Sequence, residues 1–305
     1  MDKQRKTKAI FYMTVGLPGS GKSTWTKTFA AEHGCAVHSS DAIRRERIEG
    51  ETVWDVMKKR TVASLEAGES VIYDATNLSR KLRRDILDTV RGLGAERIAV
   101  LILAPIEECK RRNRGRKGRT RVPDYVIDKM IRDFNIPTTY YEFDRIMTVQ
   151  SGIGDDRVDL DFDQENLHHA FTCAEHVRRA EVMILSQNVD LAEKDPERLA
   201  VLAEAARFHD VGKAFTKTFD TRPGKDPTIA HYYGHENYGA YWYLTTRPVD
   251  ERTLRVAAII NYHMRPNYWG SERTRAADLR DFGPEMIDDL ERFHRADVGA
   301  KRPTE

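Results

Sequence analysis

Cysteine is scarce in this sequence of 305 residues. The three cysteines, Cys35, Cys109 and Cys173, lie far apart and are odd in number. Such a set suits reduced thiols better than a disulfide framework. No apolar stretch is long enough to span a membrane. The basic amino terminus lacks the apolar core of an export signal. These absences predict a cytoplasmic protein with no membrane partner.

Net charge is also small, because 50 lysines and arginines face 48 aspartates and glutamates, for a formal net charge of +2. This balance gives no general reason to expect a polyanionic partner. Internal repeats and low-complexity tracts are absent as well. The length suits about two domains, each with its own hydrophobic core.

The sequence does contain a complete phosphate-binding loop. Residues 16–24 read GLPGSGKST, which fits GxxxxGK[ST], and they follow an apolar, β-branched stretch at 9–15. In such loops the glycines let the backbone fold around phosphate oxygens, the lysine reaches the β- and γ-phosphates, and the next hydroxyl binds Mg²⁺. We therefore expect a site for ATP and Mg²⁺, with Ser23 as a ligand of the metal. The predicted nucleotide-binding residues are Gly16, Gly19, Ser20, Gly21, Lys22, Ser23 and Thr24.

Polar side chains follow the next two expected strands. One strand ends in SSDAIR, which holds Asp41 and Arg44, and the other ends in DATNL, which holds Asp74 and Asn77. Taken alone, a polar residue at such a point is more simply a helix cap. Two polar strand ends in one parallel sheet favour a shared active-site edge instead, because parallel strands end at the same edge.

Apolar runs alternate with helical patterns through the first half of the chain, which predicts a parallel α/β sheet flanked by helices. After the continuous apolar run at 98–103, residues 110–121 carry eight cationic side chains and no acid. A run of charge is commonly a solvated face. Behind a strand of a nucleotide-binding sheet, this run also suits a lid that closes arginines over a transferring phosphoryl group.

These four motifs together resemble the 5′-polynucleotide kinase domain of bacteriophage RNA-repair enzymes, over residues 9–148. That family transfers the γ-phosphate of ATP to a 5′-hydroxyl end of RNA or DNA. The resemblance implies that Asp41 is the general base on this hydroxyl, and that Arg44 binds the phosphate 3′ to the accepting nucleoside. It places Asp74 and Asn77 on the acceptor side. The residues implied to act on ATP and its donor phosphates are Lys22, Arg112 and Arg116.

The pattern changes after a polar junction that contains glycine, so the predicted domains are 1–150 and 151–305. Strand patterns disappear beyond the junction, which predicts an all-α second domain. Eight of the ten histidines lie after residue 165. Imidazole and carboxylate together suit Mn²⁺, Fe²⁺, Ni²⁺, Co²⁺ or Zn²⁺, so we expect a divalent transition metal there. The candidate side chains are His176, His209, Asp210, His235, His263, His294 and Asp297.

This arrangement resembles the HD phosphohydrolase superfamily, through the fragments FTCAEHV, ARFHDVGK, YYGHENYGA, NYHMRP and RADVGA. The implied metal ligands are His176, His209, Asp210 and Asp297. The resemblance further implies that His235 and His263 bind a second metal or the substrate phosphate, and that Lys213 contacts phosphate in catalysis. Either His169 or His235 could protonate the leaving oxygen.

A 5′-kinase joined to a phosphohydrolase predicts an enzyme that heals nucleic-acid ends in a bacterial or phage-infected cell. It would add a 5′ phosphate and remove a 3′ or 2′,3′-cyclic phosphate, after which a ligase could act. One alternative is a nucleoside or nucleotide kinase fused to an HD nucleotidase. Another is a nucleotide-gated binding protein without catalysis. The cationic run and Arg44 favour nucleic acid over a metabolite, and the complete set of Lys22, Ser23 and Asp41 favours catalysis.

Overall fold

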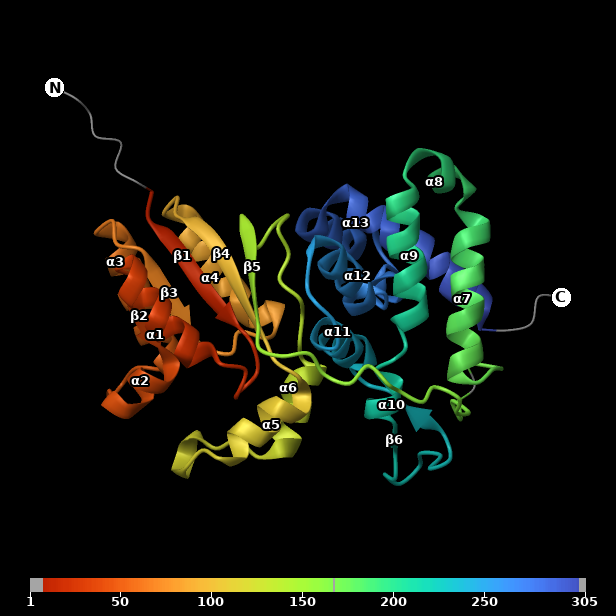
Figure 1. Cartoon of the computed structure of the whole chain (residues 1–305), viewed down its shortest axis with the longest axis horizontal. Coiled ribbons are helices and arrows are strands. Elements are labelled where there is room, and N and C mark those ends of the chain that lie inside the picture. Colours follow the sequence, from red (N-terminus) through yellow and green to blue (C-terminus); the bar gives the residue numbers. More distant parts are fainter. Residues whose placement is uncertain (1–7, 167, 302–305) are drawn as a thin grey trace. The chain divides into compact units, whose positions relative to one another are not determined.

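The computed structural model of the chain describes residues 8–166 and 168–301, which form two compact units (Figure 1). The first unit holds the residues up to 127 together with 137–152, and the second holds 128–136 and the residues after 152. Helix α6 (Asp124–Arg132) therefore begins in the first unit and ends in the second. Within the described ranges, no helix is both long enough and apolar enough to cross a membrane.

The first unit is built on a five-stranded parallel sheet with the strand order β2-β3-β1-β4-β5. Its strands are β1 (Ile10–Val15), β2 (Ala36–Ser39), β3 (Val71–Asp74), β4 (Glu96–Leu103) and β5 (Arg145–Gln150). The helices that connect them are α1 (Lys22–His33), α2 (Ser40–Glu46), α3 (Val53–Glu66), α4 (Arg80–Gly92) and α5 (Ile106–Arg114). The predicted parallel α/β sheet with flanking helices is confirmed.

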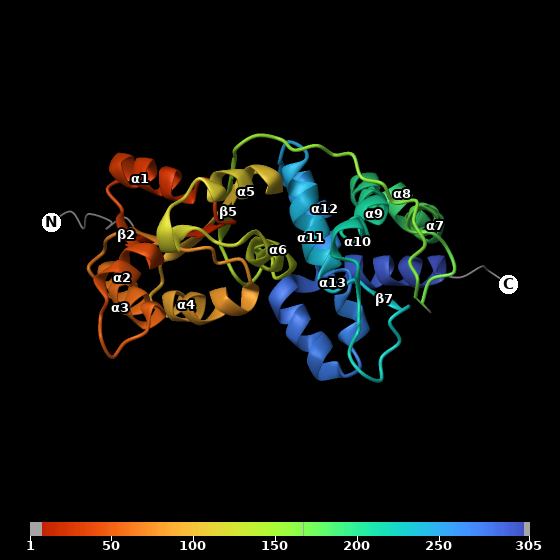
Figure 2. The same ribbon diagram turned by 90° about the horizontal axis from the view of Figure 1, so that it is seen from below.

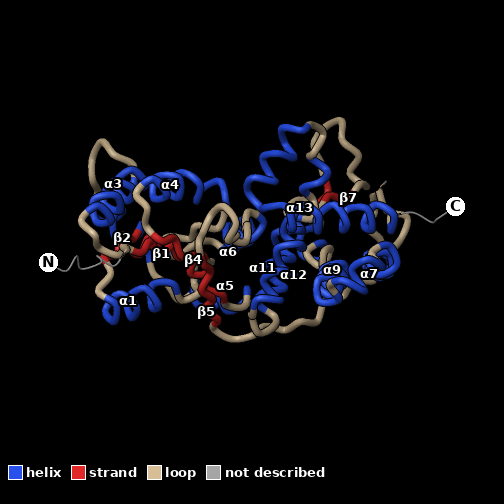
Figure 3. The backbone as a smooth tube through the Cα atoms, turned by 90° about the horizontal axis from the view of Figure 1, so that it is seen from above, coloured by secondary structure: helices blue, strands red, loops and turns tan. Residues whose placement is uncertain are grey.

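Helices cover both faces of this sheet. Phe11 and Met13 of β1 belong to one buried cluster, with Met57 of α3 and side chains of α4. Tyr12 points to the other face, where its ring centroid lies 5.0 Å from that of Phe29 in α1. Figures 2 and 3 show the same layers, with α3 and α4 on one side of the strands and α1 and α5 on the other. Burial on both faces explains why β1 and β4 are apolar along most of their length.

The cationic run at 110–121 is not one continuous loop. Its first five residues end helix α5, and its glycine-containing part forms the 3₁₀ turn η1 (Gly118–Thr120). Glu107 and Glu108 occupy the first turn of α5, where acids favour a helix, and they pair with cations one turn later. Five of the twelve residues thus belong to a helix that the acids before them stabilise, and the lid stays a prediction.

The second unit is helical apart from one short strand pair. Helix α7 packs against α9 and α13, and α12 packs against α9 and α11. Helix α13 is interrupted at Gly283, and Pro284 follows. Antiparallel β6 (Thr218–Phe219) and β7 (Ala230–His231) are the exception to the all-α expectation. The helical elements are α7 (Cys173–Gln187), α8 (Val189–Lys194), α9 (Pro196–Phe208), α10 (Lys213–Thr216), α11 (His235–Thr245), α12 (Glu251–Tyr262), η2 (Arg265–Tyr268) and α13 (Glu272–Ala300).

Candidate active sites

The phosphate-binding loop joins β1 to α1. Strand β1 ends at Val15 and α1 begins at Lys22, so the predicted nucleotide residues form the turn and the first turn of the helix. Gly19 has a φ of 88°, and a Cβ there would lie 2.3 Å from the carbonyl oxygen of Cys109. The Ser20 hydroxyl is buried and has no hydrogen-bond partner among the described residues. A tight turn with a buried, unpaired hydroxyl at a helix N-terminus suits the binding of phosphate oxygens.

Lys22 lies over this loop. Its Nζ donates to the carbonyl oxygens of Gly16, at 3.0 Å, and of Leu17, at 2.7 Å. Burial lowers the pKa of Lys22 to about 8, although the nearby Asp74 carboxylate opposes the shift. Ser23 and Thr24 are exposed on the first turn of α1. Lys22 is therefore a half-buried cation whose charge is only partly offset, as an ammonium that binds phosphate should be.

The structure brings the two polar strand ends to the same edge of the sheet as this loop. Asp74 ends β3 and is buried, and its carboxylate accepts a long hydrogen bond of 3.4 Å from the Thr14 hydroxyl of β1. Burial raises the pKa of Asp74, while the charge of Lys22 lowers it. Asp41 begins α2 and forms an exposed ion pair with Arg44, with Oδ1 and Nη1 2.9 Å apart. Asp41 and Asp74 interact electrostatically with Lys22, so the three charges share one site.

Asn77 serves the loop that follows β3. It has a φ of 45°, which is unusual for a residue with a side chain, and its Nδ2 donates to the carbonyl oxygen of Thr14 at 2.8 Å. Its own carbonyl oxygen accepts from Arg83 at 3.1 Å. The predicted acceptor-side role of Asn77 thus coexists with a structural one, in which it fastens the loop to β1.

Three arginines of the cationic run, Arg112, Arg114 and Arg116, have different surroundings. Arg112 donates to the Gly19 carbonyl oxygen at 3.4 Å and to the Ser151 hydroxyl at 2.9 Å, so it reaches the phosphate-binding loop. Arg114 pairs with Asp124 at 2.7 Å, away from the loop. The charge of Arg116 contributes to the lowered pKa of Lys22. Arg112 therefore contacts the phosphate-binding loop, and the charge of Arg116 acts on Lys22 in that loop.

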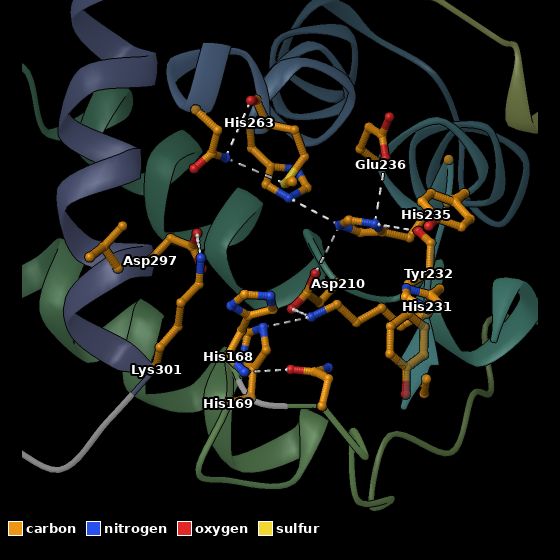
Figure 4. Close-up of a pocket in the computed structure, with 18 of the residues that line it drawn as sticks. His168, His169, Asp210, His231, Tyr232, His235, Glu236, His263, Asp297 and Lys301 are labelled. Carbon is orange, nitrogen blue, oxygen red and sulfur yellow. Dashed lines mark hydrogen bonds and ion pairs between the residues drawn. The ribbon is translucent and has the colours of Figure 1, made fainter. Parts of the chain in front are cut away.

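The second unit gathers histidines and aspartates from helices α7, α11 and α13 and from the turns that follow α9 and α12. Two groups have ligand atoms that all lie within 4.8 Å of one another. The first group is His176, His209 and Asp297, and the second is His209, Asp210 and His263. His235 joins them, because its Nε2 lies 3.2 Å from Asp210 Oδ1 and 3.3 Å from His263 Nε2 (Figure 4). His294 is outside both groups, although it lies one turn before Asp297 on α13.

The backbone fixes the orientation of three of these imidazoles. In each, Nδ1 lies 2.8 Å from the carbonyl oxygen three residues earlier, as in His209 with Ala206, His235 with Tyr232 and His263 with Ile260. A carbonyl oxygen only accepts, so Nδ1 carries the proton and the neutral ring keeps its lone pair on Nε2. These Nε2 atoms point at one another and at the carboxylates. Two facing lone pairs, as in His235 and His263, need a proton or a cation between them.

His176 gives a second reason to expect a cation. Its Nε2 lies 3.2 Å from His209 Nε2 and 3.0 Å from Asp297 Oδ1. Its Nδ1 is buried and has no hydrogen-bond partner among the described residues. The donor set of imidazole nitrogens and carboxylate oxygens is the one that divalent transition metals prefer. The residues present therefore fit the predicted metal.

Two lysines lie beside the carboxylates. Lys213 Nζ is 2.7 Å from Asp210 Oδ2 and donates to the Gln164 amide oxygen at 2.6 Å. Lys301 Nζ is 3.1 Å from Asp297 Oδ2. Both lysines line the pocket beside the cluster. Figure 4 labels Lys301 next to Asp297. Their position gives a phosphate group two ammonium partners next to the metal ligands.

The pKa values of three imidazoles in and beside the cluster are strongly shifted. Burial disfavours a charged His209, but Asp210 and Asp297 outweigh burial and raise the pKa of His209 to about 10. Burial, together with the charges of His209 and His235, lowers the pKa of His263 well below its ordinary value. Burial and Lys213 lower the pKa of His169 to about 3, so His169 is neutral at physiological pH and poorly suited to donate a proton.

The sequence pattern did not single out every residue of these sites. Lys301 was missed, although it stands four residues after Asp297 on one helix, a spacing that puts both on the same face. Trp54 was also missed; the Arg44 guanidinium lies 5.8 Å from its ring centroid. A search for cations and aromatics one helical turn from each predicted ligand could have found the first. The second depends on the packing of α2 against α3, which no local pattern reveals.

Comparisons with known proteins bear on the first unit. Residues 11–137 match the family described as "AAA domain". The chain is 32% identical over 148 residues to the L-seryl-tRNA(Sec) kinase of Methanococcus maripaludis, an alignment that covers 44% of this chain and 56% of that protein. The chain thus spans about half the length of this relative.

Two solved structures are also similar to about half of the chain. A fungal RNA kinase has 17% identity and a TM-score of 0.39, covering 50% of this chain and 79% of its own. A putative kinase from Chloroflexus aurantiacus has 14% identity and a TM-score of 0.38, covering 47% and 85%. The parallel sheet and the phosphate-binding loop identify a P-loop α/β domain. The sequence of this domain is similar to that of a kinase.

Proposed function

We propose that this chain is a bifunctional enzyme that heals nucleic-acid ends. The first unit transfers the γ-phosphate of ATP to a 5′-hydroxyl, and the second hydrolyses a 3′ or 2′,3′-cyclic phosphate. The observation that carries the proposal is the presence of two separate sets of phosphate-handling residues in one chain. One set surrounds Lys22 at the sheet edge, and the other surrounds the His176, His209, Asp210 and Asp297 cluster.

In the first unit, each residue has a task that its position supports. Lys22 and the loop amides hold the donor phosphates, and Arg112 and Arg116 neutralise charge as the phosphoryl group moves. Ser23 would hold Mg²⁺, which when bound supplies positive charge beside the donor phosphates. Asp41 orients the 5′-hydroxyl and accepts its proton, and Arg44, its ion-pair partner, binds the acceptor's own phosphate. The name of the Methanococcus relative, a kinase for L-seryl-tRNA, supports an acceptor attached to RNA.

Arg44 distinguishes a polynucleotide acceptor from a metabolite. We expect Arg44→Ala to raise KM for a 5′-hydroxyl oligonucleotide at least tenfold, about 1.4 kcal/mol, and to leave KM for ATP unchanged. Arg45→Ala is the matched control, because Arg45 is an exposed arginine on the same helix. Equal effects of the two variants would contradict the role of Arg44. Phosphorylation of free nucleosides, with no effect of competing oligonucleotides, would favour the metabolite-kinase alternative.

In the second unit, His176, His209, Asp210 and Asp297 would hold a divalent cation, with His235 and His263 beside it. A bound divalent metal supplies Lewis acidity, which lowers the pKa of water and polarises phosphate oxygens. Lys213 and Lys301 bind the phosphate oxygens and stabilise the negative charge that develops on them. Because the backbone carbonyl oxygens hold Nδ1 protonated, each of these imidazoles directs Nε2 inward, where the neutral ring would offer its lone pair to the cation.

Lys213 gives a sharp test of the hydrolase. We expect Lys213→Met to lower kcat/KM for release of a 3′ phosphate from RNA by about 100-fold, as loss of one charge-stabilising donor does elsewhere. Lys217→Met is the matched control, because Lys217 pairs with Glu165 and does not line the pocket. Metal content per chain, measured on the same samples, should be equal in all three proteins. A parent protein that binds no divalent metal would contradict this half of the proposal.

A further inference from the structure

The pocket beside the metal-ligand cluster, lined by Asp210, His235, His263 and Asp297 of that cluster, is larger than a phosphate group requires. Its volume is about 940 Å³, and all the residues that line it belong to the second unit. Clefts of about 300–1,000 Å³ hold ligands the size of a nucleotide or a drug, and recognition in them comes from the wall as well as from the floor. The wall of this pocket also carries side chains that the hydrolysis does not use.

Two exposed tyrosines stand on that wall. Tyr233 is 69% exposed and Tyr268 is 62% exposed, and both line the pocket. An isolated exposed aromatic residue carries little meaning. The described residues include four exposed tyrosines, and two of them line this one pocket. A pair of aromatic rings beside a phosphate site is the arrangement that binds nucleobases by stacking.

Tyr233 is held in place by its neighbours. Its ring stacks on that of His231, with centroids 5.3 Å apart and planes 9° from parallel. Gly234 follows with a φ of 75°, and a Cβ there would lie 2.8 Å from the Cβ of Arg132. This turn allows Tyr233 to face solvent while His235, two residues later, enters the cluster.

Tyr268 is fixed in a different way. It ends η2, the 3₁₀ turn that begins two residues after His263. On its two sides Arg265 and Trp269 both donate to the buried Asp278 carboxylate, from Nη2 at 2.7 Å and from Nε1 at 2.8 Å. The backbone on either side of Tyr268 is thus anchored while its ring stays in solvent, which reduces the entropy that a ligand would have to offset on binding.

We propose that Tyr233 and Tyr268 form a stacking platform for the base of the nucleoside whose phosphate lies at the metal-ligand cluster. This inference rests on the proposed phosphohydrolase function and specifies its substrate class as nucleoside phosphates and RNA ends. Lys213 and Lys301 bind the phosphate at the floor, and the base reaches the aromatic wall. Stacking accepts any base, so the platform selects for a base without selecting a sequence.

The test compares two phosphomonoesters that differ in carrying a base. Adenosine 3′-monophosphate has one and glycerol 2-phosphate does not, and release of inorganic phosphate is followed for both. All proteins carry Arg44→Ala and no ATP is added, so that the first unit contributes little binding. The variants are Tyr233→Ala, Tyr268→Ala and the Phe substitutions at both positions. Tyr140→Ala is the matched control, because Tyr140 is also 62% exposed and lies in the first unit.

We expect each Ala variant to raise KM for adenosine 3′-monophosphate by about 5-fold to 150-fold, with kcat little changed, because a stacked base contributes binding in ground state and transition state alike. Both Phe variants and Tyr140→Ala should match the parent, and glycerol 2-phosphate should be hydrolysed equally by all. Equal losses on both substrates, or no loss on either, would overturn the platform.

A parent protein inactive on both esters with every divalent metal would instead contradict the proposed hydrolase. The platform is then decided by equilibrium dialysis of adenosine 3′-monophosphate in EDTA. Weaker binding in the Ala variants supports it, and unchanged binding overturns it.

Discussion

The buried ion pair between Arg83 and Glu142 predicts a large and specific loss of stability in the first unit. Arg83 of α4 is fully buried, and its Nε and Nη2 donate to the two carboxylate oxygens of Glu142 at 2.8 and 2.9 Å. Its Nη1 donates to the carbonyl oxygens of Asn77 and Leu78, at 3.1 and 3.0 Å. Arg83 therefore ties α4 and Glu142 to the loop after β3 that borders the predicted acceptor site.

Glu142→Gln keeps the shape of the side chain and leaves the Arg83 charge buried with its partner neutralised. Removing one partner of a buried ion pair costs about 3–5 kcal/mol. Glu46→Gln is a matched control, because Glu46 accepts from Arg60 with the same two-point geometry, at 2.9 and 2.6 Å, but on the surface. An exposed pair of this kind is worth about 0–1 kcal/mol.

Denaturant unfolding with and without ATP is the assay, because the transition that ATP shifts belongs to the first unit. We expect Glu142→Gln to lower the free energy of unfolding of that transition by about 3–5 kcal/mol and Glu46→Gln by less than about 1 kcal/mol. The double variant Arg83→Met with Glu142→Leu should recover much of the loss, since it buries no charge. Equal and small losses in the two single variants would refute the reasoning.

Three further outcomes are expected. Burial lowers the pKa of Lys22 to about 8, so its side chain loses its proton as the pH rises through that value. The affinity for ATP, measured by calorimetry, should therefore fall about tenfold from pH 7 to pH 9. An affinity that does not depend on pH would contradict this. Mn²⁺ at 100 times its Kd should stabilise the EDTA-treated second unit by about 2.7 kcal/mol, and Asp210→Asn should lose that stabilisation. Burial raises the pKa of the Cys173 thiol, and Cys109 is buried too, so a thiol reagent at pH 8 should modify the native chain at Cys35 well before either of them.

Local patterns were sufficient for the phosphate-binding loop and for the sheet around it. The motif GxxxxGK[ST] fixes how many residues separate Lys22 from the strand before it. In the structure that strand ends at Val15 and the helix begins at Lys22, as the motif predicts. The histidines and aspartates of the second unit could be predicted as a group, because most histidines of the chain fall in its helical second half. Their convergence could not be, since His176 and Asp297 meet only through the packing of α7 against α13.

Other features depend on contacts that no local pattern contains. Arg83 and Glu142 are 59 residues apart, and each alone reads as an ordinary surface charge. The αL conformation of Asn77 follows from its bonds to Thr14 and Arg83. No helix was predicted over the first five residues of the cationic run, although the acids in the first turn of α5 were visible in the sequence.

One assay tests the central proposal most directly. An RNA oligonucleotide with a 5′-hydroxyl and a 2′,3′-cyclic phosphate is incubated with ATP, Mg²⁺ and Mn²⁺, and both ends are analysed after reaction with the parent, Asp41→Ala or His209→Ala. We predict that the parent changes both ends, that Asp41→Ala loses only 5′ phosphorylation, and that His209→Ala loses only removal of the 3′ phosphate. A parent that leaves either end unchanged, or a single substitution that abolishes both reactions in folded protein, would contradict two independent active sites in this chain.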